Sequence, residues 1–217
     1  MSRPRQHFSA LDEVLLRADG VLRALTRTGM RQRRPSPALD VDDTATLAPE
    51  ERRLSAALMR VNHAGEVCAQ ALYVGQAIFT REPQTRETLL CAASEESDHL
   101  LWCEERLSEL DDRPSRLNPV WFTGSLAIGA VAGLAGDRLN LGFVEETERQ
   151  VVEHLQSHLK RLPERDRRSR AVVRAMQKDE ARHADTAVAQ GARSLPWLMR
   201  SLMRLHARVM TTVAHRV

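Results

Sequence analysis

The stretch Glu95-Glu96-Ser97-Asp98-His99 decides the fold, because it places a carboxylate and an imidazole three residues apart in a long helical pattern. Residues with this spacing share one face of a helix. Apolar residues recur around them at intervals of three and four, and this stripe runs through both Glu96 and His99; it comprises Leu89, Leu100, Cys103 and Leu107. The pattern therefore points two polar side chains into a core, where each needs a polar partner or a metal ion.

The motif occurs a second time, as Glu180-Ala181-Arg182-His183, again inside an apolar stripe. A further glutamate lies about one helix length before each copy, Glu66 before the first and Glu148 before the second. Two helices with one Glu each and two helices with Glu-x-x-His supply the ligands of a ferritin-like dinuclear carboxylate site. The sequence therefore predicts an all-α protein built on a ferritin-like four-helix bundle.

Three carboxylates compete for the ligand position on the third helix of this bundle. Its apolar stripe includes Glu148, whereas Glu146 falls on the polar side and Glu145 lies at the edge of the stripe. We predict Glu148 as the ligand and keep Glu145 as the alternative.

Composition agrees with a single helical domain. The 217 residues are 42% hydrophobic, 28% charged and only 4% aromatic, which favours helices over sheets. Three cysteines, an odd number without Cys-x-x-Cys spacing, argue against a disulfide framework or a zinc knuckle and favour a reducing compartment. The first 18 residues do not have the pattern of a secretory signal, so a cytoplasmic location is expected.

The chain divides into a short N-terminal region and one domain. Residues 9–29 predict an amphipathic helix and residues 31–46 a linker, so residues 1–47 precede a ferritin-like domain over residues 48–217. The arginine run at 31–34 has no element or aromatic platform for reading nucleic acid, and no nucleic-acid partner is expected.

Two apolar segments lie outside the four helices that carry the motifs. Residues 120–135 have no charge and several glycines, but are too short for a confident membrane span. They predict either a buried helix or a segment that dips into a membrane surface or lines a tunnel for an apolar substrate. Residues 195–215 predict a basic amphipathic helix, which suits either a membrane surface or the bundle of another subunit.

The segment Leu-Met-Arg-Val-Asn-His-Ala-Gly-Glu-Val-Cys-Ala-Gln-Ala-Leu-Tyr, residues 58–73, resembles the Coq7 family of demethoxyubiquinone hydroxylases. The likeness continues through both Glu-x-x-His motifs and the third helix, and it covers most of the chain from about residue 48 onward. This resemblance implies a di-iron monooxygenase with two iron ions per chain, a 3-demethoxyubiquinol 3-hydroxylase of ubiquinone biosynthesis that uses dioxygen. It also implies a bacterial-type protein that is bound peripherally to the cytoplasmic face of the cell membrane. The expected protein partners are further copies of this chain in a homo-oligomer, or another protein of ubiquinone biosynthesis.

Carried over residue by residue, the iron ligands implied by the resemblance are Glu66, Glu96, His99, Glu148, Glu180 and His183. By the same analogy, Glu96 and Glu180 bridge or chelate the metals, and Glu66 and Glu148 are terminal. We expect His154 to support a ligand imidazole, with Asp98 and Asp185 as weaker candidates.

Two other residues need an interpretation. His63 stands three before Glu66, and we expect an exposed or capping histidine there, since six ligands are already present. Tyr73 either faces the site or is an aromatic of the core. Two other functions use the same residues. One is iron storage or peroxide scavenging, and the other is a helical adaptor whose carboxylates and histidines form a metal-free network.

Overall fold

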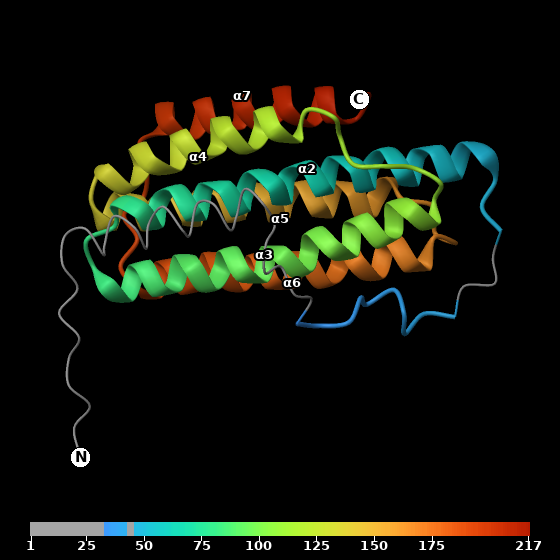
Figure 1. The fold of residues 1–217 in the computed structure, drawn as a ribbon, viewed down its shortest axis with the longest axis horizontal. Helices are drawn as coiled ribbons and strands as arrows, with labels where there is room; N and C mark the ends of the chain where they lie inside the picture. Colours follow the sequence, from blue (N-terminus) through green and yellow to red (C-terminus); the bar gives the residue numbers. More distant parts are fainter. Residues whose placement is uncertain (1–32, 43–45) are drawn as a thin grey trace, which may run out of the picture.

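The computed structural model describes residues 33–42 and 46–217, and all regular secondary structure in these ranges is helical (Figure 1). The all-α prediction is confirmed, whereas the helix predicted over residues 9–29 lies outside the described residues. The helices are α2 (Pro49–Phe79), α3 (Pro83–Glu109), α4 (Asn118–Leu134), α5 (Asp137–Arg161), α6 (Arg167–Ala189) and α7 (Trp197–Ala214).

Helix starts follow local chemistry. Pro49 and Pro83 occupy the first turns of α2 and α3, where a missing backbone N–H costs nothing. The side chain of Asp166 caps α6 by accepting a hydrogen bond from the backbone nitrogen of Ser169 at 3.0 Å. These residues fix where each helix begins, and so fix which residues reach the same level of the bundle.

Helices α2, α3, α5 and α6 share one apolar core. All four contribute side chains that are 1% exposed or less, namely Leu58, Met59, Trp102, Cys103, Leu107, Leu155, Val172, Val173 and Met176. Helices α3 and α6 run antiparallel, and α4 and α7 lie side by side outside the four (Figure 1). The motif-bearing helices therefore form the inner bundle, and the two additional apolar segments cover it.

Helix α4 packs closely on α2 because glycines remove the side chains between them. A Cβ atom added at Gly129 would lie 2.3 Å from the carbonyl oxygen of Leu72, and one at Gly75 would lie 2.3 Å from that of Leu126. The opposite face of α4 is exposed at Val120, Val131 and Leu134. Within the described residues, no helix is both long and apolar enough to cross a membrane. Residues 120–135 are thus partly a packed helix and partly an apolar surface.

This packing predicts opposite effects for two alanine substitutions in the same helix. Gly129→Ala is expected to lower the free energy of unfolding by about 1–3 kcal/mol, because the new methyl group meets backbone atoms that cannot move aside. Gly124→Ala, whose Cβ meets nothing within 4 Å, should raise it by about 0.5–1 kcal/mol. Urea unfolding of both variants checks this, and equal effects would contradict the close contact.

Residues 33–42, here named the N-terminal strap, lie against the inner bundle. Ala38 is buried within the core shared by the four helices, and Arg168 on α6 donates a hydrogen bond to its carbonyl oxygen at 3.2 Å. The described part of the predicted linker is therefore docked on the protein.

Candidate metal centre

Six acidic and histidine side chains converge in the middle of the inner bundle. Glu66 comes from α2, Glu148 from α5, and each Glu-x-x-His motif from α3 or α6. They form two overlapping groups, in each of which one atom from every residue lies within 4.8 Å of the others: Glu66, Glu96, His99 and Glu180, and Glu96, Glu148, Glu180 and His183. Glu96 and Glu180 belong to both groups, so the arrangement provides two adjacent positions for cations.

The first imidazole faces three carboxylates through a single nitrogen. Nδ1 of His99 lies 3.0 Å from Glu96 Oε2, 3.1 Å from Glu180 Oε1 and 3.4 Å from Glu66 Oε2. One ring N–H donates to one acceptor well, and cannot satisfy carboxylates that arrive from three helices.

The second imidazole repeats this pattern. Nδ1 of His183 lies 3.0 Å from Glu180 Oε2, 3.5 Å from Glu96 Oε1 and 3.8 Å from Glu148 Oε1. Both nitrogens therefore point at positions that a cation would fill better than a proton.

Several carboxylate oxygens in the cluster are buried without a well-aligned hydrogen bond from the described residues. They are Oε1 of Glu96, Oε1 of Glu180 and both oxygens of Glu148. A buried acceptor without a donor is costly unless a metal ion takes the place of the donor. The donor set of carboxylate oxygens and imidazole nitrogens suits iron or manganese, so the residues present fit a pair of such ions.

The electrostatics show how the cluster holds protons when it holds no metal. Burial, together with the charge of Glu96, raises the pKa of Glu66 well above its usual range. Burial and the charge of Glu180 raise the pKa of Glu148 to about 8. Burial alone would raise the pKa of Glu180 as well, but its contacts with His183 and His99 hold that pKa at about 2. The surrounding carboxylates also raise the pKa of both histidines despite their burial.

The outer nitrogens of the two imidazoles are held by acidic residues of the opposite motif. Nε2 of His99 lies 3.1 Å from Asp179 Oδ2, and Nε2 of His183 lies 2.8 Å from Glu95 Oε2. Such contacts fix the orientation of a ligand imidazole. Neither residue was predicted from the sequence, although each directly precedes the glutamate of a Glu-x-x-His motif.

The residues expected to support the imidazoles lie elsewhere. His154 packs against His158, with ring centroids 4.0 Å apart, and has no contact with the cluster among the described interactions. Asp98 is buried but binds the N-terminal strap, and Asp185 is exposed. The third-helix alternative Glu145 pairs with Arg149 at 2.9 Å, outside the cluster.

The structure also shows where His63 and Tyr73 lie relative to the cluster. The expectation of an exposed His63 is wrong, because the side chain is fully buried and lies 3.0 Å from Glu104 and 3.2 Å from Asn118. Tyr73 faces the cluster, with its ring edge-on to His183 at 6.4 Å between centroids.

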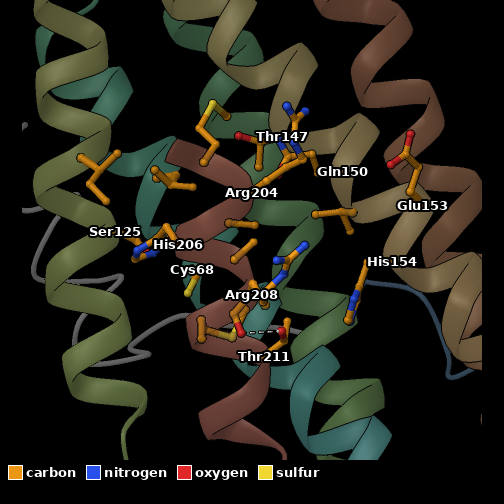
Figure 2. Close-up of a pocket in the computed structure, with 18 of the residues that line it drawn as sticks. Cys68, Ser125, Thr147, Gln150, Glu153, His154, Arg204, His206, Arg208 and Thr211 are labelled. Atoms are coloured by element: carbon orange, nitrogen blue, oxygen red, sulfur yellow. Dashed lines mark hydrogen bonds between the residues drawn. The ribbon is translucent and has the colours of Figure 1, made fainter. Parts of the chain in front are cut away.

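A cavity of about 710 Å³ is lined by residues of α2, α4, α5 and α7, and part of this lining is drawn in Figure 2. Glu66 is the one predicted ligand in its lining, which also includes Leu72, Ile128, Phe143 and Met199. Polar side chains also border it, among them Gln150 and His154 of α5 and Arg204 of α7 (Figure 2). The cavity is therefore mainly apolar and borders the carboxylate cluster at Glu66.

Four helices that each bring carboxylates to one buried cluster define a ferritin-like carboxylate bundle. The model of a family described as ubiquinone biosynthesis protein COQ7 matches residues 53–214. The chain belongs to this family.

Three relatives are named 3-demethoxyubiquinol 3-hydroxylase. The protein from Xanthomonas euvesicatoria pv. vesicatoria is 53% identical over 99% of this chain and 98% of its own length. The protein from Xanthomonas campestris pv. campestris (strain 8004) is 54% identical over 98% and 97%, and that from Acidovorax sp. (strain JS42) is 56% identical over 95% and 100%. These likenesses confirm the prediction of an enzyme, a hydroxylating oxidoreductase of ubiquinone biosynthesis.

Proposed function

We propose that this chain hydroxylates the ring of a demethoxyubiquinol with dioxygen at a pair of iron ions. The observation that carries the proposal is the pair of overlapping donor groups, which share Glu96 and Glu180 and border a mainly apolar cavity through Glu66. The names of the relatives supply the substrate.

Glu66, Glu96, His99 and Glu180 would hold one iron, and Glu96, Glu148, Glu180 and His183 the other. The shared pair, Glu96 and Glu180, would then be available to both ions. Two ferrous ions bound there would supply the electrons and the Lewis acidity that activation of dioxygen requires. The buried carboxylates fix the geometry of the ions, and their four negative charges match two ferrous ions.

The remaining residues bind and orient the substrate. The apolar lining of the cavity at Leu72, Ile128 and Phe143 excludes water and accepts a quinol ring with the start of its isoprenoid tail. Because Glu66 is the predicted ligand that borders this cavity, the ring approaches the cluster from the side of α2. Glu95 and Asp179 hold the imidazoles in orientation while the substrate enters.

Substitutions at Gly65 test this route. Gly65 lines the cavity next to Glu66, and a Cβ there meets nothing within 4 Å, so an added side chain enters the cavity. Gly65→Phe is expected to lower kcat/KM for the quinol at least about tenfold while the iron content stays the same, because misplacement of the ring is costly. Gly65→Ala is the matched control and should resemble the parent. Parent-like kinetics in both variants would place the substrate elsewhere.

We also propose that the protein binds peripherally to the cytoplasmic face of the cell membrane through α4 and α7. These neighbouring helices expose large apolar side chains, namely Val120, Ile128, Val131, Leu134, Trp197, Leu198, Met199, Leu202, Leu205 and Val209. Ile128, Met199 and Leu202 also line the cavity, so its opening borders this apolar face. Arg200, Arg204 and Arg208 add positive charge that suits anionic lipid headgroups.

Vesicle binding checks this surface. The double variant Trp197→Glu, Leu205→Glu is expected to bind vesicles of phosphatidylcholine and phosphatidylglycerol at least about tenfold more weakly, because two apolar side chains lose their burial. Leu90→Glu, which changes another exposed leucine that lies on α3, should bind as the parent does. Loss of self-association in the double variant, with vesicle binding unchanged, would instead assign the face to a second subunit.

Iron storage or peroxide scavenging would use the same six residues, but needs neither the cavity nor the exposed apolar face. Quinol turnover distinguishes these functions from hydroxylation. The metal-free adaptor is distinguished by iron content, since it predicts a chain that binds no iron.

A further inference from the structure

We propose that Arg34, in the N-terminal strap, is a positioning residue of the metal centre and acts on His99 through Asp179. The inference rests on the proposed function, because it assigns a role toward the bound metals. It adds a residue from outside the four helices to the machinery of the site.

Arg34 joins two acidic residues that belong to opposite motif helices. Its Nη1 donates to Asp179 Oδ2 on α6 at 2.7 Å, and its Nε donates to Asp98 Oδ2 on α3 at 3.1 Å. The backbone nitrogen of Arg33 donates to the other oxygen of Asp98 at 2.7 Å. The side chain of Asp98 is 1% exposed and that of Asp179 is 11% exposed, so both carboxylates need such partners.

The contact with Asp179 reaches the predicted iron ligand directly. The same oxygen, Asp179 Oδ2, accepts from Arg34 and lies 3.1 Å from Nε2 of His99. Arg182 donates to the second oxygen, Oδ1, at 3.0 Å. Both oxygens of the Asp179 carboxylate are therefore held by arginines, and Arg34 holds the oxygen that contacts the His99 imidazole.

Trp102 fixes the place of Arg34. Its indole nitrogen donates to the carbonyl oxygen of Arg34 at 3.1 Å, and the guanidinium lies 4.8 Å from the centroid of a Trp102 ring. Trp102 also packs against His99, with ring centroids 5.2 Å apart. The strap, Trp102 and His99 thus form one continuous set of contacts.

The geometry requires arginine and not only a positive charge. A guanidinium presents several N–H groups in a fixed plane and so spans two carboxylates on different helices, whereas an ammonium is a point charge on a flexible stem. Loss of the bridge frees Asp179 to turn away from His99, and the imidazole then loses its orientation toward the metal.

Cobalt(II) titration of the full chain, read by its visible d–d spectrum, tests the proposal in Arg34→Ala, Arg34→Lys and the parent. Both variants are expected to bind cobalt about 10–100-fold more weakly than the parent, with an altered spectrum, because the support of a ligand imidazole is lost. The control is Arg52→Ala, which removes an exposed arginine paired with Asp111 and should match the parent.

Parent-like cobalt affinity and spectrum in either Arg34 variant would overturn the proposal. Circular dichroism of the metal-free proteins shows whether each variant folds, and Arg34→Lys decides the matter if Arg34→Ala does not fold. A parent chain that binds neither cobalt nor iron would count against the proposed function. This outcome differs from parent-like binding in the Arg34 variants, which would count only against the role of Arg34.

Discussion

Glu148→Ala is expected to lose one of the two irons and to lower quinol hydroxylation at least about 100-fold, because the variant lacks a terminal carboxylate of the proposed site. Glu148 is buried beside Glu180 and His183, and both of its oxygens lack a hydrogen bond from the described residues. Elemental analysis after anaerobic loading with ferrous iron, together with turnover of a demethoxyubiquinol, measures the two effects.

Glu145→Ala is the matched control, because it removes a carboxylate three residues away on the same helix. Glu145 pairs with Arg149 and has a side chain that is 17% exposed, so its loss should leave iron content and turnover unchanged. Loss of iron in Glu145→Ala but not in Glu148→Ala would show that the third helix presents the other carboxylate to the metals.

Ferrous binding at pH 7 is expected to release protons from the cluster, because metal ligands bind in the deprotonated form. The pKa values of His99, His183, Glu66 and Glu148 lie above their usual values in the metal-free chain, and that of Glu148 is about 8. A group with a pKa above 7 carries its proton at pH 7 and must give it up to the metal. Affinity for the iron pair should therefore fall as the pH falls.

Each proton released should steepen the fall of the apparent binding constant for the two ions by about tenfold per pH unit below pH 7. Proton release in a weakly buffered solution with an indicator dye, and ferrous titrations at pH 6, 6.5 and 7, provide two independent measurements. Glu148→Gln should lower the number of protons released by at least about one, since glutamine has none to lose. Iron binding without proton release would contradict the protonation described for the cluster.

Periodicity predicted the inner bundle and the cluster because both depend on which side of a helix a residue occupies. The choice of Glu148 over Glu145 followed from one apolar stripe, and the structure buries the former and leaves the latter partly exposed.

Periodicity could not predict which side chains on different helices contact each other. His154 was expected to support a ligand imidazole, but the residues that hold the imidazoles are Asp179 and Glu95, each on the helix opposite. The part played by Arg34 depends on where the strap docks, and no local pattern encodes this. The burial of His63 depends similarly on partners from the distant Glu104 and Asn118.

Helices α3 and α6 are joined by polar contacts at three levels. Gln190 donates a hydrogen bond to Thr88 at one end. In the middle, the imidazole of each helix contacts a carboxylate of the other. At the other end, Arg106 donates to Ser169 and Asp166. Apolar stripes tolerate a slip of one helical turn, since one aliphatic side chain replaces another, but these pairs do not. The polar contacts therefore set the alignment of the two helices along their axes. A misaligned pair formed during folding would lose hydrogen bonds at all three levels.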